Sequence, residues 1–383
     1  MAMTNELVLK NARIILQDEV LEGAVLIRDG KIADISTGAL HAGGEDLEGD
    51  YLVPGLVELH TDHLEIHYGP RPGVRWNMKA AIQAHDAQIA ASGITTVFDC
   101  LRMGSDEDEG FQHGEMRALA DAMEASEAEG RLRSEHRIHL RCEVSSSNVL
   151  EDFGAFDKDP RVGLVSLMDH APGQRQFQDI AQYTKYYKAK RKMNDEQFAR
   201  FIEERQAQSA EYADPHRKAI AAVCKERGIT IASHDDATIA HVEEAVGFGV
   251  RLAEFPTSFD AAKASHAAGM SVLMGAPNIV RGGSHSGNVA AKDLAELSVL
   301  DVLSSDYVPI SLIHAPFVLA DAVEAISLPQ AIAMVTATPA RTVSLEDRGR
   351  IAPGLRADVV RVRQANGDVP IVRSVWRQGQ RVA

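Results

Sequence analysis

Apolar runs that end in polar residues recur along the middle of the chain. Helix-like stretches such as AAIQAHDAQIAAS separate most of them. Alternation of strand and helix predicts a parallel sheet, and eight such units predict a (β/α)₈ TIM barrel of the α/β class. In that fold the carboxyl ends of the strands carry the active site, so the polar endings predict where it lies. The eight runs are 55–62, 93–99, 137–143, 162–170, 229–236, 250–256, 271–278 and 301–307.

Both ends of the chain consist instead of short β-rich runs. LVLKNARIIL, GAVLIRD and KIADIS near the start are broken by Asp-Gly at 29–30, a hairpin-turn signal. RADVVRV and IVRSVWRQGQRV near the other end are separated by a turn signal at 366–368. We therefore predict a small β-sandwich domain formed by 1–55 and 346–383, beside a barrel domain at 56–345.

The segment 176–226 departs from the alternation because it is too long for one crossover helix. We predict two or three helices there, with a break at Pro215. Because this insertion follows the fourth predicted barrel strand, we expect it to lie over the barrel mouth as a lid.

Composition narrows the class of protein. The 383 residues suffice for one barrel and a smaller module. A net charge of −15 argues against nonspecific nucleic-acid binding, although a local basic pocket still allows a small anionic substrate. No apolar run is long enough to span a membrane, and the start lacks the pattern of a secretory signal.

The cysteines indicate the compartment. Cys100, Cys142 and Cys224 are an odd number without CxxC spacing, which argues against a disulfide framework and fits a reducing cytoplasm. Each lies in an apolar stretch, so we interpret all three as small core residues. A symmetric homodimer is the expected assembly.

His60 and Asp62 end the first predicted barrel strand. Residues two apart on a strand point the same way, roughly 6.6 Å apart, so both side chains can converge on one ion. An imidazole and a carboxylate are common ligands of Zn²⁺, Mn²⁺ or Fe²⁺. The pair alone is a weak signal, and its place directly after YLVPGLVELH makes it a strong one.

The string LVPGLVELHTD resembles the first metal-binding strand of the amidohydrolase superfamily, whose usual form is PGxxDxHxH. The tail RGRIAPGLRADVV resembles the closing strands of that superfamily's small β-sandwich. Within the superfamily, a group that hydrolyses a ribosyl triphosphate in phosphonate degradation is the closer match, over nearly the whole chain. The strings that carry it are SLMDHAPGQRQF, SHDDAT, GAPNIVRGGSHSGNVAA and LSSDYVP.

The resemblance implies one or two divalent ions, with Zn²⁺ or Mn²⁺ expected. Asp62 stands where most members have a second imidazole. The fourth-strand run VSLMDH lacks the superfamily's bridging lysine, and Glu143 on the third strand is predicted to take its place. His234 is the implied fifth-strand ligand. The sixth-strand run AEFPTS offers only Glu254 in place of a histidine, so His170 is predicted to compensate.

The resemblance implies that Asp306, which ends the eighth predicted strand, is the last metal ligand. It also implies that Asp306 transfers a proton during the reaction. The predicted metal ligands are thus His60, Asp62, Glu143, His170, His234 and Asp306, and Glu143 and Asp306 are also the predicted catalytic residues.

Structural alternatives stay open for several of these residues. Glu143 is alternatively an ion-pair partner of Arg141, and His170 a turn residue that contacts substrate. His63 and His67 lie just past the first strand, as loop residues that could touch metal or substrate. Asp235 and Asp236 are placed to orient imidazoles from behind.

A glycine-rich loop follows the seventh strand, where TIM barrels often hold phosphate. A basic run between Arg175 and Lys192 provides a second set of cations, with a solvated helix face as the alternative. The predicted substrate-binding residues are Arg175, Lys185, Arg281, Ser284 and His285.

The function implied by the resemblance is hydrolysis of a small phosphorylated ribose, a ribosyl 5-triphosphate, to the 5-phosphate and pyrophosphate. A metal-activated water is expected to attack the phosphorus nearest the ribose. The alternatives are an amidohydrolase that cleaves the C–N bond of a cyclic amide or aminopurine, and a non-catalytic assembly subunit.

Overall fold

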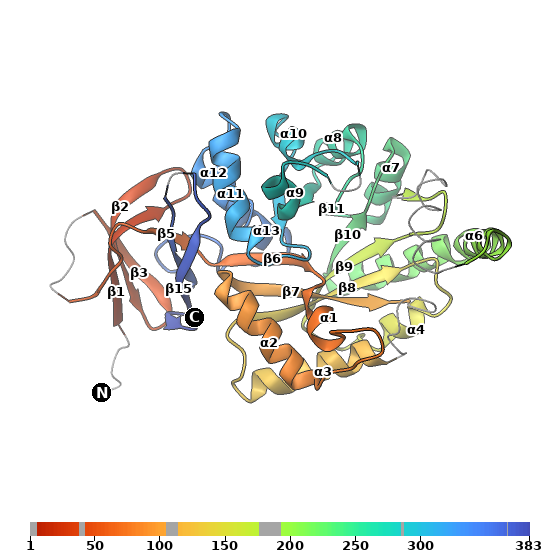
Figure 1. Ribbon diagram of the computed structural model, residues 1–383, viewed down its shortest axis with the longest axis horizontal. Coiled ribbons are helices and arrows are strands. Elements are labelled where there is room, and N and C mark those ends of the chain that lie inside the picture. The colour runs from red at the N-terminus through yellow and green to blue at the C-terminus, as the bar shows by residue number, and fades with distance from the viewer. Residues whose placement is uncertain (1–5, 38–42, 105–113, 176–192, 285–286, 366) are drawn as a thin grey trace.

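The computed structural model describes residues 6–37, 43–104, 114–175, 193–284, 287–365 and 367–383. These residues form two sheets: a parallel barrel surrounded by helices, and a separate sheet built from strands near both ends of the chain (Figure 1). None of the helices in these ranges is both long enough and apolar enough to cross a membrane.

The barrel strands follow one another in chain order, and each pairs in parallel with the next. A parallel bridge between Thr61 and Asp306 joins the last strand to the first. There the Asp62 N–H donates to the Asp306 carbonyl and the Asp306 N–H to the His60 carbonyl, each at 3.2 Å. The predicted barrel is confirmed. Its strands are β6 (Leu56–Thr61), β7 (Ile94–Met103), β8 (Glu135–Glu143), β9 (Val162–Met168), β10 (Thr230–His234), β11 (Leu252–Glu254), β12 (Ser271–Gly275) and β13 (Val302–Ser304).

Helices cover the outside of the barrel, and the strand arrows point away from the terminal sheet (Figure 1). Side-chain caps fix several helix starts: the Thr238 and Ser258 hydroxyls each accept an N–H from the first turn that follows. The helices are α1 (His63–Tyr68), α2 (Met78–Ala91), α3 (Glu115–Ala128), α4 (Val149–Gly154), α6 (Asp195–Arg227), α7 (Ile239–Phe248), α8 (Phe259–Ala267), α9 (Ala276–Arg281), α10 (Ala291–Glu296), α11 (Ser311–Ala322), α12 (Leu328–Ala333) and α13 (Ala337–Thr342).

The insertion after β9 differs from the prediction. Residues 195–227 form one helix of 33 residues, and Pro215 lies inside it, so the predicted break was wrong. A proline removes only one N–H from the helix, and buried residues on both sides of it, Ala213 and His216, hold the helix against the barrel. The Ser209 hydroxyl donates to Asp169 just beyond β9, so α6 docks at the carboxyl end of a barrel strand. The first part of the insertion, 176–192, lies outside the described residues.

The second sheet runs in the order β16-β15-β14-β5-β1-β2-β3, with β4 paired to β1. Antiparallel pairing of β5 with β14 joins the two ends of the chain. The sheet curls so that its edge turns meet: a Cβ at Gly379 would lie 2.8 Å from Ile27 Cγ2 and 3.4 Å from the Gly30 Cα. A core around Trp376 fills the fold, and the predicted second domain is confirmed. Its strands are β1 (Glu6–Ile15), β2 (Val20–Arg28), β3 (Lys31–Ser36), β4 (Glu45–Asp46), β5 (Tyr51–Pro54), β14 (Val359–Arg363), β15 (Ile371–Arg377) and β16 (Gln380–Arg381).

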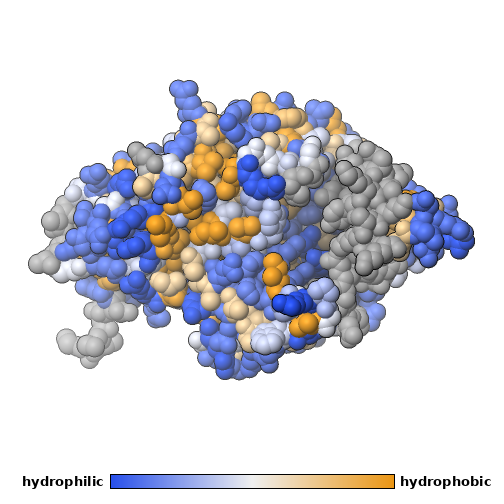
Figure 2. Space-filling view, viewed as in Figure 1, coloured by the Kyte–Doolittle hydropathy of each residue, from blue (hydrophilic) through white to orange (hydrophobic). Residues whose placement is uncertain are grey.

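Surface polarity differs between the two parts. In Figure 2, the terminal sheet presents mainly hydrophilic side chains, whereas hydrophobic ones gather over α11 and α12.

The homodimer and the domain limits at residues 55 and 346 stay predictions.

A buried ion cluster ties the barrel to the segment that leads into β14. Glu135 at the start of β8 lies 2.8 Å from an Arg348 nitrogen and also binds Arg356. Burial alone would raise the pKa of Glu135, but the two guanidinium groups lower it to about 2. A lowered pKa stabilises the folded state above the unfolded pKa of about 4.3, and the stabilisation is lost as pH falls toward 2.

We therefore expect Glu135→Gln to reduce the free energy of unfolding by about 2 kcal/mol at pH 7. The difference from the parent chain should shrink steadily between about pH 5 and pH 2, because the parent carboxylate is then protonated. Urea unfolding at several pH values measures this difference. Glu203→Gln, at an exposed position on α6, is the matched control. A difference that is equal at pH 6 and pH 3 would contradict the prediction.

Candidate metal centre

Glu254 is the last residue of β11, at the carboxyl ends of the barrel strands. Its side chain is fully buried. One carboxylate oxygen is 3.2 Å from His60 Nδ1 and the other is 3.2 Å from His234 Nδ1. The Ser166 hydroxyl donates to the second oxygen at 2.6 Å. The His60 and His234 rings stack with centroids 5.6 Å apart. Because Nδ1 of each ring faces Glu254, Nε2 of each ring is left for another partner.

The charge of Glu254 follows from its neighbours. Burial alone would raise its pKa, but the His60 ring and the hydrogen bonds from His234 and His60 hold it well below its ordinary value. An ionised carboxylate behind two imidazoles fixes their tautomers and orientation, as it does behind metal-binding histidines.

A second group of donors lies on the open side of His234. Asp235 Oδ2 is 3.5 Å from His234 Nε2 and 3.7 Å from His170 Nε2. One donor atom from each of these three residues lies within 4.8 Å of the other two. These separations are long for strong hydrogen bonds and suit donors that surround a cation.

Backbone strain marks the same strand ends. Asp235, Phe255 and Asp306 have φ angles of 56°, 53° and 53°, in the left-handed region that side chains disfavour. They directly follow or lie just beyond β10, β11 and β13. Such strain clusters at functional sites, where the surrounding structure holds it in place.

Glu143 binds His170. Its carboxylate accepts from His170 Nδ1 at 2.6 Å, from the His170 backbone N–H at 3.0 Å and from the Ser145 hydroxyl at 2.6 Å. Burial opposes both charges, yet the pair lowers the pKa of Glu143 to about 2 and raises that of His170 to about 10. A cation bound by His170 must therefore displace a proton from it.

Arg141 pairs with Asp62, so the alternative of a Glu143–Arg141 ion pair was wrong. Arg141 Nη1 lies 2.5 and 2.7 Å from the two Asp62 oxygens. Burial would raise the pKa of Asp62, and Arg141 together with His60 lowers it below its ordinary range. Burial raises the pKa of Asp306, and the neighbouring His60 ring and Arg141 guanidinium oppose this rise. The predicted ligands Asp62 and Asp306 thus share one electrostatic environment with His60.

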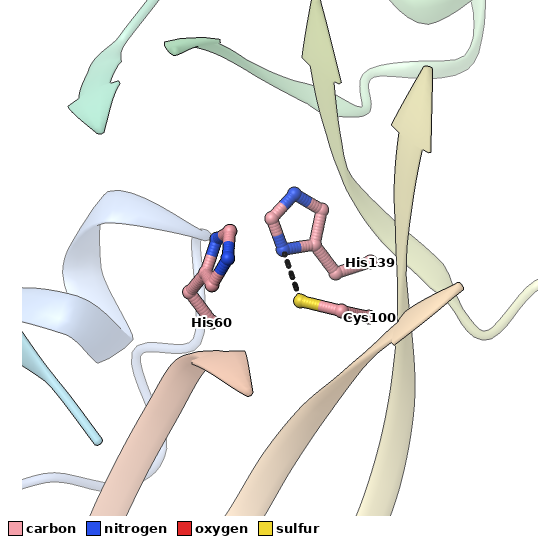
Figure 3. A group of neighbouring side chains, drawn as sticks. All are labelled: His60, Cys100 and His139. Carbon is pink, nitrogen blue, oxygen red and sulfur yellow. Dashed lines mark hydrogen bonds between the residues drawn. The ribbon is translucent and has the colours of Figure 1, made fainter. Parts of the chain in front are cut away.

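His60, Cys100 and His139 point toward one another from the neighbouring strands β6, β7 and β8 (Figure 3). Cys100 Sγ is 3.4 Å from His139 Nδ1, and that nitrogen is 2.9 Å from the Leu59 carbonyl. Burial raises the pKa of the Cys100 thiol to about 11 and lowers that of His139 to about 3, so both stay neutral. His60 packs edge-on against His139, with centroids 5.2 Å apart. All three cysteines are buried and free, as predicted.

Two functional candidates were missed from the sequence. Glu254 was considered only as the residue that stands in place of the usual sixth-strand histidine, although it is the one carboxylate of its strand run. Asp235 was placed behind the imidazoles, whereas its carboxylate faces the same space as His170 and His234. The signal for Asp235 was its position directly after a strand-end histidine.

The predicted phosphate contacts are only partly described. Arg281 is exposed and ends α9, where Gly282 takes the left-handed conformation with φ 80°. The Ser284 hydroxyl accepts from the Asn288 N–H at 3.2 Å. His285 and Lys185 lie outside the described residues.

Arg175 is in a different environment from the one predicted. Its side chain is 5% exposed, and it binds Asp236 and, at 2.6 Å, Glu244. These two carboxylates neutralise the charge of the Arg175 guanidinium, which disfavours its binding to phosphate. The contact of Arg175 with substrate stays a prediction.

The model of the amidohydrolase family matches residues 51–382. The chain belongs to the amidohydrolase family. This amidohydrolase is 46% identical to alpha-D-ribose 1-methylphosphonate 5-triphosphate diphosphatase of Escherichia coli (strain K12), over 98% of this chain and 100% of that protein. It is 29% identical to D-hydantoinase of Geobacillus stearothermophilus, over 38% of this chain and 28% of that protein.

Solved structures share the fold of this amidohydrolase. N-acetyl-D-glucosamine-6-phosphate deacetylase from Mycobacterium smegmatis superposes with a TM-score of 0.64 at 16% identity, covering 99% of both chains. Dihydropyrimidinase from Brevibacillus agri gives a TM-score of 0.61 at 13% identity, covering 98% of this chain and 95% of the other.

Proposed function

We propose that this chain hydrolyses alpha-D-ribose 1-methylphosphonate 5-triphosphate to alpha-D-ribose 1-methylphosphonate 5-phosphate and pyrophosphate. The observation that carries the proposal is the 46% identity to the Escherichia coli diphosphatase, which extends over 98% of this chain and the whole of that protein. Partial resemblance to D-hydantoinase over 38% of the chain leaves C–N bond hydrolysis as the second candidate.

The donor set fits a divalent metal at the carboxyl ends of the strands. Imidazoles and carboxylates together suit Zn²⁺ or Mn²⁺. The ring Nε2 atoms of His60 and His234 are left for an ion, because Glu254 occupies the Nδ1 atoms. We propose one or two ions held by His60, Asp62, Glu143, His170, His234 and Asp306, with Asp235 as an additional ligand.

When bound, such an ion acidifies a water and neutralises charge on the phosphoryl oxygens. The chain's own groups do the rest. The half-buried Asp306 carboxylate, whose pKa is raised by desolvation, accepts the proton of the attacking water. Glu254 keeps the imidazoles of His60 and His234 oriented throughout. Arg281 at the end of α9 and Ser284 in the loop that follows hold the triphosphate.

The deciding experiment compares two reactions with one preparation. Purified chain with Zn²⁺ or Mn²⁺ should release pyrophosphate from the ribosyl triphosphate and leave a cyclic amide intact. Removing metal with a chelator should abolish release, and adding metal back should restore it. Hydrolysis of the cyclic amide without pyrophosphate release would overturn the proposal in favour of the second candidate.

Arg281 tests the phosphate contact. Arg281→Ala should raise KM for the triphosphate about tenfold and change kcat by less than about twofold, because a charge-assisted hydrogen bond to bound substrate is lost. Steady-state kinetics measures both. Arg200→Ala on α6, at a guanidinium that is 71% exposed and pairs with Glu196 of the same helix, is the control. Unchanged KM in Arg281→Ala would remove this residue from the binding site.

A further inference from the structure

Three imidazoles lie together outside the set proposed for the catalytic centre. His63 and His67 are one turn apart on α1, and His85 is on the neighbouring helix α2. One ring nitrogen from each lies within 4.8 Å of the other two. The ring centroid of His63 is 4.9 Å from that of His67 and 5.7 Å from that of His85.

The nearest pair of nitrogens has the spacing of two metal ligands. His63 Nδ1 and His85 Nδ1 are 3.4 Å apart. Two nitrogens bound to one tetrahedral Zn²⁺ at about 2.05 Å are themselves roughly 3.4 Å apart. The alternative is a hydrogen bond between the two rings, which requires one of these nitrogens to carry a proton.

The tautomer of His85 is fixed from behind. Its Nε2 is 2.6 Å from Asp99 Oδ1, so that nitrogen carries the proton and Nδ1 presents a lone pair toward His63. Asp99 also accepts from His136 Nδ1 at 2.7 Å, and His136 Nε2 lies 3.3 Å from Asp86. A carboxylate behind a histidine is the usual support of a metal ligand.

The charge behind the three rings favours a cation. Burial opposes the charged form of His136, yet Asp99 and Asp86 raise its pKa to about 10, so it is an imidazolium between two carboxylates. Arg133 also pairs with Asp86, at 3.3 Å, so the carboxylate that faces His85 directly is Asp99.

His67 supplies an independent observation. Its Nε2 is buried and has no hydrogen-bond partner among the described residues. A buried nitrogen of this kind costs free energy unless something binds it. Burial, followed by the His85 ring, lowers the pKa of His67, and a weaker contact of its ring with the Gln88 side chain opposes this shift.

We propose that His63, His67 and His85 form a tri-histidine site for Zn²⁺ or a similar divalent transition metal. Three neutral imidazoles with an open fourth position are a known zinc ligand set. The ion would fasten α1, which begins directly after Asp62, to α2 and through Asp99 to β7. The site does not depend on the proposed function, because none of its ligands belongs to the catalytic set.

A substitution that adds a spectroscopic signal tests the site. His67→Cys replaces one imidazole with a thiolate ligand and should keep the metal. Titration of the metal-free variant with Co²⁺ should produce a thiolate-to-cobalt charge-transfer band in the near ultraviolet, which saturates with one equivalent per chain. The parent chain, whose three cysteines are buried, should lack that band.

Metal content gives a second measurement. His67→Gln should retain one zinc fewer per chain than the parent after exhaustive dialysis. His266→Gln, at an imidazole that is 41% exposed and far along the chain, should retain the parent amount. Circular dichroism establishes that each variant is folded. A folded His67→Cys without the cobalt band, or equal zinc content in His67→Gln and the parent, would overturn the proposal.

Discussion

His234→Asn is expected to lower kcat for pyrophosphate release by about 10³-fold or more. His234 is the imidazole shared by both donor groups of the proposed centre: it stacks on His60 and faces Asp235 and His170. An ion bound there is expected to contribute several kcal/mol of transition-state stabilisation, and about 4 kcal/mol corresponds to 10³ in rate. Single-turnover release of pyrophosphate measures the loss, and metal analysis of the same sample relates it to ion content.

The control variant makes the same histidine-to-asparagine change at a different histidine. His266→Asn alters a half-exposed imidazole near Asp301, which directly precedes β13 and so lies at the opposite end of that strand from the proposed centre, and it should retain parent activity. If His234→Asn keeps full activity at saturating metal, His234 is not a ligand in the reaction. If it keeps metal but loses activity, the imidazole acts on substrate instead of the ion.

The barrel was predictable because its signal is local. Each buried strand is a short apolar run, and side chains near its carboxyl end must project toward one rim. Those strand ends, together with the resemblance to the amidohydrolase superfamily, predicted that His60, Glu143, His170 and His234 meet at one rim although they are far apart in sequence. The curled terminal sheet was predictable for a similar reason, since β-rich runs at both ends need a common partner.

The pairing of charges was not predictable. Arg141 is two residues from Glu143, yet its guanidinium binds Asp62 on another strand end, and the Glu143 carboxylate binds His170. Arg175 carries a guanidinium, a common phosphate-binding group, but Asp236 and Glu244 already neutralise its charge. Sequence shows which cations exist, and only packing shows which of them are already paired.

Pro215 failed as a break signal for a related reason. Proline removes a hydrogen bond from a helix at a cost of roughly 3 kcal/mol, which local reasoning treats as decisive. In α6 that cost is offset by burial of the helix against the barrel and by a hydrogen bond from His216 to the Val144 carbonyl. Tertiary contacts that lie many residues away do not appear in a local pattern.

Glu254 carries the other large expected effect. Glu254→Gln keeps the size of the side chain and removes the negative charge that faces His60, His234 and the Ser166 hydroxyl. An amide can accept from one ring but offers its other end as a donor, so one imidazole loses its support. We expect metal affinity to fall by about 10- to 100-fold, as it does when such supporting carboxylates are replaced.

The same substitution should lower the free energy of unfolding by about 3 kcal/mol, because it breaks a fully buried charge cluster. Isothermal titration with Zn²⁺ or Mn²⁺ measures the affinity, and urea unfolding of metal-free protein measures stability separately. Glu243→Gln, at an exposed position on α7, should change neither. Unaltered metal affinity in a folded Glu254→Gln chain would mean that His60 and His234 are held by their packing against Phe255 and His139, and not by this carboxylate.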